Sequence, residues 1–209
     1  MSVQQFEDAR WRGSDQKTEF RHKEAVKFIE NGTVLDVGCG DGLLLTLLKQ
    51  KGIIAEGVDI SPEGVAKCVA AGFVAKVHSV DGPLPYQDRS FDTVVLLDVL
   101  EHVYDPAVVL REVARVARMQ VIVSVPNFSS LPARLQTLHG EVPENNRPHK
   151  GHVYWFNDAV LRGVVHDAGL AIETLRMNTF SPFSTLGISP ALWPNGLALS
   201  FVARLKRTQ

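Results

Sequence analysis

Cysteine is scarce in this chain of 209 residues, which has only Cys39 and Cys68. Neither lies in a C-x-x-C pair or in a spacing typical of zinc ligands. The pattern therefore argues against a disulfide-stabilised scaffold and against a cysteine zinc site. Free cysteines are typical of a reducing compartment, so a cytoplasmic location is predicted.

An excess of charge of one sign and a long apolar run are also missing. The formal net charge is −1, and Lys and Arg are scattered, which argues against a nucleic-acid partner. The apolar run Val94 to Leu100 is short and interrupted by Asp98, so no insertion into a membrane is expected. Residues Gln4 to Arg12 are polar and charged, unlike a signal peptide. The length suits one domain with a sizeable core.

A glycine-rich stretch directly follows a predicted buried strand. Thr33 to Val37 is a β-branched and apolar run, and Gly38, Gly40 and Gly42 follow it at alternate positions. A leucine-rich segment comes next and is predicted to be helical over 42–51. A strand, a glycine loop and a helix in this order form the first half of a nucleotide-binding βαβ unit. The glycines allow close approach of the backbone to a ligand, and the helix directs its free N–H groups toward it.

The spacing of the glycines distinguishes between ligands. The dehydrogenase pattern G-x-G-x-x-G would require glycine where this chain has Leu43, so a nicotinamide-dependent oxidoreductase is the less favoured interpretation. Asp36 ends the strand, and its carboxylate would repel a pyrophosphate but suits a ligand with an ammonium and a sulfonium. The pattern D-x-G-x-G-x-G resembles the first motif of class I S-adenosylmethionine-dependent methyltransferases. The resemblance implies S-adenosylmethionine as cofactor and S-adenosylhomocysteine as product, contacted by Asp36, Gly38, Cys39 and Gly40.

Asp59 ends the second predicted strand, seventeen residues beyond Gly42. In nucleotide-binding βαβ folds an acid at this point accepts hydrogen bonds from the ribose hydroxyls. Asp59 could instead cap the next helix, but Ser61-Pro62 already supplies a cap and a first turn. We therefore predict that Asp59 binds the ribose, with Ile60 beside it.

Two later loops complete the predicted cofactor site. Residues 84–92 resemble the L-P-F…S-F-D signature of small-molecule methyltransferases, and this resemblance places Asp81 beside the adenine amino group. The carboxyl end of a central strand faces the ligand crevice, so the backbone there should contact the methionine part. The residues predicted from these loops are Val80, Asp81, Gly82, Leu97 and Asp98.

The stretch Leu100 to Pro106 matches the L-E-H-V-x-D-P pattern of ubiquinone- and menaquinone-type methyltransferases. His102 could serve as a general base, since its ordinary pKa lies near neutrality. A packing histidine explains the motif equally well, and both alternatives stay open. His149-Lys150-Gly151-His152 holds two further histidines, but no cysteine or acid lies nearby, so no metal site is predicted.

Predicted helices alternate with predicted strands, which indicates an α/β fold. The expected architecture is a Rossmann-like three-layer α/β/α sandwich with a mostly parallel seven-stranded sheet, whose last two strands form an edge hairpin as in the superfamily. Residues 1–209 are predicted to form a single methyltransferase domain with an N-terminal helical cap (1–32), in which Trp11 is either a lid residue or a cap on the core. Insertions beside the substrate are expected at 128–156 and 179–197. The predicted helices are 16–30, 42–51, 62–71, 106–118 and 158–167, and the predicted strands are 33–37, 53–59, 73–78, 93–97, 121–125, 171–177 and 197–205.

A second resemblance concerns the branch of the superfamily. Val123 to Phe128 and Arg134-Leu135-Gln136 resemble the V-S-F-P-N-F…R-L-Q segment of MetW, the methionine-biosynthesis branch, which typically lacks the Glu101-His102 pair. The methyltransferase resemblance implies an enzyme that methylates a small-molecule acceptor. The MetW resemblance implies an alternative, in which the chain is a cofactor-binding partner or regulatory subunit of an acyltransferase. A homodimer or a protein partner would use the apolar segment 179–197.

Overall fold

The central sheet has seven strands in the computed structural model, which describes residues 3–12 and 17–208. The strands are β1 Thr33–Val37, β2 Ile54–Asp59, β3 Val74–Val77, β4 Phe91–Leu97, β5 Ala117–Pro126, β6 Leu170–Thr179 and β7 Ala198–Arg207. Their order across the sheet is β3-β2-β1-β4-β5-β7-β6. The first five strands in this order pair in parallel, whereas β7 runs antiparallel to both β5 and β6. The predicted mostly parallel sheet and its edge hairpin are confirmed.

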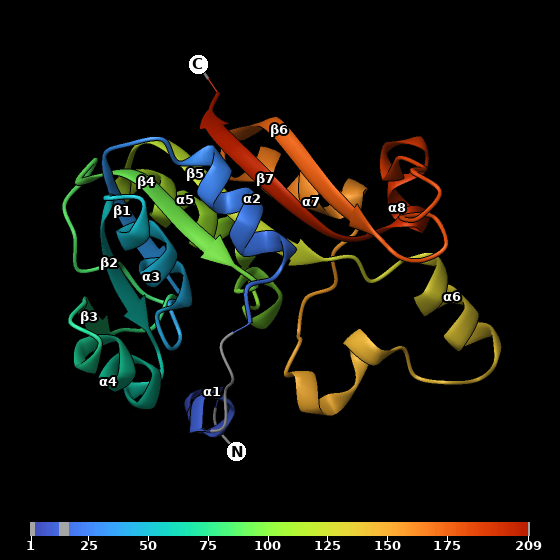
Figure 1. Ribbon diagram of the computed structural model, residues 1–209, viewed down its shortest axis with the longest axis horizontal. Coiled ribbons are helices and arrows are strands. Elements are labelled where there is room, and N and C mark those ends of the chain that lie inside the picture. The colour runs from blue at the N-terminus through green and yellow to red at the C-terminus, as the bar shows by residue number, and fades with distance from the viewer. Residues whose placement is uncertain (1–2, 13–16, 209) are drawn as a thin grey trace.

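Helices cover both faces of this sheet. On one face, α2 (Phe20–Phe28) and α3 (Leu43–Gln50) pack against Val34 of β1 and Val95 of β4. On the other face, α5 (Pro106–Val116) and α7 (Asp158–Asp167) enclose the larger core cluster, which contains Leu35 and Leu96 from the same two strands. Successive residues of a strand point to opposite faces, so each strand contributes to both clusters. Figure 1 shows α2 and α3 in front of the sheet and α5 and α7 behind it, the predicted three-layer sandwich.

Side-chain caps start three of the helices where the sequence indicates them. The Ser61 hydroxyl accepts from the Gly64 N–H at 3.1 Å and starts α4 (Pro62–Ala70), which packs against β2 and β3. Asp105 and Asn157 likewise accept from Val108 and Val160 at the first turns of α5 and α7. These bonds satisfy N–H groups that have no partner within the helix.

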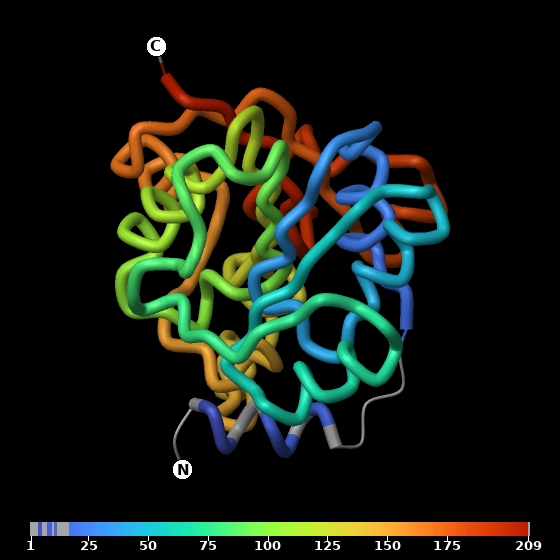
Figure 2. Tube along the Cα trace, turned by 90° about the vertical axis from the view of Figure 1, so that its left-hand side faces the viewer, coloured from blue at the N-terminus to red at the C-terminus, as the bar shows by residue number. Residues whose placement is uncertain are grey.

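The N-terminal region differs from the predicted single helix over 16–30. α1 (Val3–Arg12) precedes the gap at residues 13–16, and α2 begins only at Phe20. Glu19 caps α2 in a reciprocal arrangement, because its own N–H donates to His22 Nδ1 at 3.2 Å. α1 packs against α4 and lies at the bottom of the view in Figure 2.

The second half of the chain contains structure that was not predicted. α6 (Leu131–Leu138) lies within a segment that has no helical periodicity. Ser130 is at its N-cap and Pro132 in its first turn, positions where these residues are common. α6 contacts α8 (Pro194–Leu197), so the two predicted insertions meet beside the start of β7 (Figure 1). Short 3-10 helices, η1 Leu100–His102, η2 Glu144–Asn146, η3 Pro148–Lys150 and η4 Pro190–Leu192, complete the elements among the described residues.

Strands β5, β6 and β7 each extend beyond their predicted bounds. Strand β5, for example, spans Ala117–Pro126 rather than 121–125. The apolar pattern marks only the buried middle of such a strand, while backbone pairing with a neighbour continues through polar ends. No helix among the residues that the structure describes is long and apolar enough to cross a membrane.

Candidate functional site

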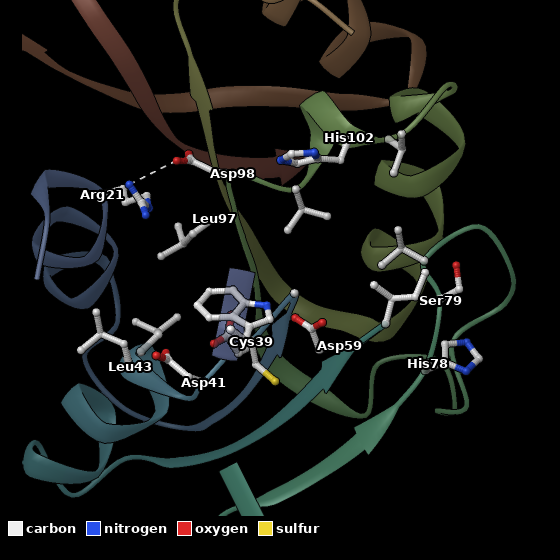
Figure 3. A pocket seen from close by; sticks show the side chains of 18 of the residues that line it. Arg21, Cys39, Asp41, Leu43, Asp59, His78, Ser79, Leu97, Asp98 and His102 are labelled. Atoms are coloured by element: carbon white, nitrogen blue, oxygen red, sulfur yellow. Dashed lines mark ion pairs between the residues drawn. The ribbon is translucent and has the colours of Figure 1, made fainter. Parts of the chain in front are cut away.

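A cavity of about 320 Å³ opens at the carboxyl ends of β1, β2 and β4. Parallel strands bring these ends to one edge of the sheet, which is where open α/β sheets bind ligands. His102 and most of the predicted cofactor residues line the cavity, and Figure 3 shows several of them around its opening. The predicted cofactor residues in the wall are Asp36, Gly38, Cys39, Asp59, Ile60, Val80, Asp81, Leu97 and Asp98.

Gly40 and Gly82 do not line the cavity, although both were predicted to contact the cofactor. Gly40 is covered by Trp11: a Cβ added to Gly40 would lie 2.3 Å from the Trp11 ring. Gly82 lies in a more open part of its loop, where an added Cβ would meet nothing within 4 Å. The glycine at position 40 therefore makes room for an aromatic side chain of the protein.

Gly38 requires both its backbone freedom and its lack of a side chain. Its φ is +80°, and an added Cβ would lie 2.4 Å from a methyl group of Val99. The N–H groups of Gly38 and Cys39 both donate to the Val58 carbonyl, at 2.8 and 3.1 Å. These two hydrogen bonds attach the glycine loop, which follows β1, to the end of β2.

Asp59 fastens the same loop from the side. One carboxylate oxygen accepts from the Gly40 N–H at 2.8 Å, and the other accepts from the Ser61 N–H at 2.8 Å. The residue is only 6% exposed, yet its carboxylate reaches the cavity (Figure 3). A carboxylate oxygen can accept more than one hydrogen bond, so these two bonds do not by themselves prevent Asp59 from binding a ligand hydroxyl.

Asp36 lies deepest in the site and is only 3% exposed. Burial, and then the nearby Asp59 carboxylate, raise the pKa of Asp36 to about 8. Two carboxylates facing one cavity favour a cationic ligand, because its positive charge offsets the cost of burying them in ionised form and weakens their mutual repulsion. This electrostatic arrangement agrees with the cationic ligand that the sequence predicts.

The raised pKa of Asp36 predicts a pH dependence of both stability and binding. The folded pKa of about 8 lies above the ordinary value of 3.8, so the folded state binds more protons and its stability falls as pH rises from 4 to 8. A cationic ligand favours ionised Asp36, so binding near neutral pH should release up to about one proton per chain. Titration calorimetry with S-adenosylmethionine in buffers of different ionisation enthalpy measures this release. Asp36→Asn should abolish it, and proton-independent binding by the wild type would refute the prediction.

Asp98 adopts an unusual backbone conformation at the end of β4. Its φ is +56°, and its N–H donates to the Ser124 hydroxyl at 3.0 Å. The Ser124 hydroxyl in turn donates to the Asp98 carboxylate, whose other oxygen lies 3.2 Å from Arg21 Nη1 (Figure 3). Left-handed non-glycine residues are often found at functional sites, where surrounding contacts hold them. Here those contacts turn the chain from β4 into η1 and the cavity wall.

Helix α2 contributes residues that the sequence did not indicate. Arg21 and His22 line the cavity beside Trp11, which thereby takes the lid position rather than that of a core cap. Burial, and then the adjacent Arg21, lower the pKa of His22 to about 4, so this imidazole is neutral at pH 7. No motif marks these residues, because their approach to the cavity depends on the path of the chain before β1.

His102 stands on the opposite side of the cavity, at the end of η1 (Figure 3). Its Nδ1 lies 3.2 Å from the Gly151 carbonyl, and its ring meets that of His152 edge to face at 4.8 Å between centroids. His152 Nε2 is in turn 3.9 Å from a Glu101 oxygen. The expectation that no acid lies near His152 is therefore wrong: residues 128–156 fold back onto η1. His149 instead faces Glu144 at the surface.

Comparison with known proteins identifies a family for this chain. The model of the family "Methionine biosynthesis protein MetW" matches residues 20–167. A ubiquinone biosynthesis O-methyltransferase of Xanthomonas oryzae is 29% identical over 160 residues, which cover 72% of this chain and 67% of that protein.

Solved structures with the same fold are more distant in sequence. A putative methyltransferase in complex with the Haloferax volcanii Trm112 activator has a TM-score of 0.72 at 21% identity, over the full length of both chains. Magnesium protoporphyrin IX methyltransferase from Synechocystis, with bound S-adenosylhomocysteine, has a TM-score of 0.65 at 20% identity and covers 99% of this chain and 95% of that one. The family match spans more than half of the chain, and the topology and the cavity agree with it. The chain therefore belongs to the MetW family, within the class I S-adenosylmethionine-dependent methyltransferases.

Proposed function

We propose that this protein transfers the methyl group of S-adenosylmethionine, bound above Gly38, to a small-molecule acceptor. The observation that carries the proposal is the meeting of buried Asp36, the Gly38 loop and Asp59 in one cavity. The cavity volume of about 320 Å³ lies within the range of small-molecule sites. Asp36 would attract the cationic part of the cofactor, Asp59 the ribose, and Asp81 the adenine. The cofactor supplies an electrophilic methyl group on its sulfonium.

The residues of the chain orient the acceptor and remove its proton. His102 lines the cavity, and its Nδ1 faces a carbonyl that can only accept a hydrogen bond, so Nδ1 donates and the neutral form of the ring has its lone pair on Nε2. We assign to this nitrogen the removal of a proton from an acceptor hydroxyl. The ubiquinone biosynthesis O-methyltransferase relative supports an oxygen acceptor. Residues 1–32 would cover the cofactor, and insertions 128–156 and 179–197 would flank the acceptor, within a single cytoplasmic domain.

Cofactor binding is the first prediction of this proposal. S-adenosylmethionine and S-adenosylhomocysteine should each raise the free energy of unfolding by about 2.7 kcal/mol at a hundredfold excess over Kd, because they bind only the folded chain. Thermal-shift and calorimetric titrations measure the effect. NAD and NADP serve as negative controls and also test the oxidoreductase interpretation. The proposal fails if neither methyl-donor ligand shifts the unfolding temperature or gives binding heat.

The family match also favours a second candidate function, that of a partner in methionine biosynthesis. Segment 179–197 exposes large apolar side chains, including Leu186 at 69%, Leu192 at 79% and Trp193 at 43% exposure, as a homodimer or protein interface would require. Co-purification from the native host distinguishes the two functions. A purified chain that methylates a small molecule by itself supports the enzyme. A chain that binds the cofactor but acts only by changing the rate of a co-purified acyltransferase supports the partner.

A further inference from the structure

Three side chains that commonly ligate metal ions converge beside the cavity. One oxygen of Glu101 and one nitrogen each of His102 and His152 all lie within 4.8 Å of one another. Glu101 and His102 follow β4, whereas His152 lies near the end of the predicted insertion 128–156. Backbone hydrogen bonds join the two segments: the Val153 and Tyr154 N–H groups both donate to the Glu101 carbonyl, at 2.8 and 3.0 Å.

Backbone carbonyls determine which nitrogen of each histidine carries a proton. Nδ1 of His102 faces the Gly151 carbonyl at 3.2 Å, and Nδ1 of His152 faces the Asn145 carbonyl at 2.7 Å. A carbonyl oxygen only accepts, so both Nδ1 atoms donate, and in the neutral rings the lone pair is then on Nε2. An imidazole oriented by an N–H bond to a carbonyl is the usual form of a metal-ligating histidine.

Burial and spacing favour a cation between these groups. Glu101 is 1% exposed and the His152 side chain 10%, and a carboxylate at that depth is stable when it faces positive charge. Glu101 Oε1 lies 3.9 Å from His152 Nε2, and the ligand atoms of Glu101, His102 and His152 all lie within 4.8 Å of one another. Nitrogen and oxygen ligands about 2.0–2.2 Å from one zinc ion lie about 3.3–3.6 Å apart in a tetrahedron, so the ligand atoms would have to approach one another by up to about 1.5 Å to complete the site.

We propose that Glu101, His102 and His152 bind one divalent transition-metal ion, such as Zn²⁺, at the acceptor end of the cavity. Two imidazoles and one carboxylate suit such ions and leave at least one coordination position open. His102 is the ligand that lines the cavity, and we place the open position on its side of the ion, toward the acceptor.

The catalytic use of the ion rests on the proposed function. An acceptor hydroxyl bound at the open position loses its proton to solvent more readily, because the ion stabilises the oxygen anion. That oxygen then forms the new bond to the methyl carbon as the carbon–sulfur bond breaks and the electron pair stays on sulfur. His102 acts here as a ligand, and the ion performs the activation that His102 alone would otherwise provide.

The test uses untagged full-length protein, treated with a chelator and then titrated with Co²⁺, whose visible absorption reports imidazole ligation. We expect one Co²⁺ per chain, displaced by one equivalent of Zn²⁺. His152→Ala and Glu101→Gln should each weaken metal binding at least about 100-fold, since each removes a ligand. His149→Ala is the matched control. His149 lies on the same insertion, 128–156, but 61% of its side chain is exposed beside Glu144. It should bind Co²⁺ as the wild type does.

Folding and cofactor binding are measured on the same samples. Far-UV circular dichroism identifies a variant that has lost its fold, and His152→Asn then replaces it as a milder change. The metal proposal is overturned if the folded wild type binds no stoichiometric Co²⁺, or if His152→Asn and His149→Ala bind it equally well. Calorimetry with S-adenosylmethionine on the metal-free chain keeps the two proposals apart. Cofactor binding without metal binding refutes only the metal site, and metal binding without cofactor binding refutes only the methyl-transfer function.

Discussion

His102→Ala is expected to lower turnover by about 10²–10⁴-fold while leaving cofactor affinity within a few-fold of wild type. The imidazole lies across the cavity from Cys39 and Asp59 (Figure 3). Whether His102 removes the proton itself or holds an activating ion, its loss affects the reacting oxygen and not the binding of the donor. Initial rates with a labelled methyl donor, on an acceptor identified by a product screen of native-host extract, measure the effect. Calorimetry gives cofactor affinity separately.

His149→Ala is again the control and should keep wild-type turnover. A packing role for His102 would give a different result, in which the variant loses thermal stability and cofactor affinity together. A variant as active as wild type would exclude His102 from acceptor activation. Attention would then move to His152 and Tyr154. A chelator that reduces wild-type turnover to the level of His102→Ala would favour the metal over direct proton removal.

Asp59→Ala is expected to weaken binding of S-adenosylmethionine by about 1.5–3 kcal/mol, or roughly 10- to 150-fold, because hydrogen bonds to a charged group are lost. Two effects add: the ribose hydroxyls lose an acceptor, and the Gly40 and Ser61 N–H groups lose theirs. The loop after β1 should therefore also become less stable. Such a loss of stability would not be expected for an aspartate exposed at the end of a strand. Calorimetry of the cofactor and thermal unfolding of the free protein measure both effects.

Asp59→Asn separates the two contributions, since the amide keeps one acceptor oxygen but has no charge. It should bind the cofactor better than Asp59→Ala and less well than wild type. Asp167→Asn, at an aspartate whose side chain is 70% exposed at the end of α7, should change neither quantity. If Asp59→Ala loses stability but keeps wild-type cofactor affinity, Asp59 only fastens the glycine loop.

The sequence alone was sufficient for the fold class and for ten of the 23 residues that line the cavity. The run from Thr33 to Gln50 is continuous, and its strand, loop and helix form from neighbouring residues. Asp59 and Leu97 were placed correctly at the cavity because parallel strands end at the same edge of a sheet, whatever the loops do. Features of this kind follow from local periodicity and from one general rule of topology.

Side chains that reach the cavity along irregular paths were decided only by the tertiary structure. Trp11 covers Gly40, and Arg21 pairs with Asp98, because of the route that the chain takes before β1. His152 approaches Glu101 because of the fold of insertion 128–156, whose sequence has no regular periodicity. Backbone hydrogen bonds to the Glu101 carbonyl hold the end of this insertion in place. The raised pKa of Asp36 likewise depends on its depth and on the distance to Asp59. Burial and distances between remote segments are properties of the packed chain, so residue types and spacings in the sequence could not supply them.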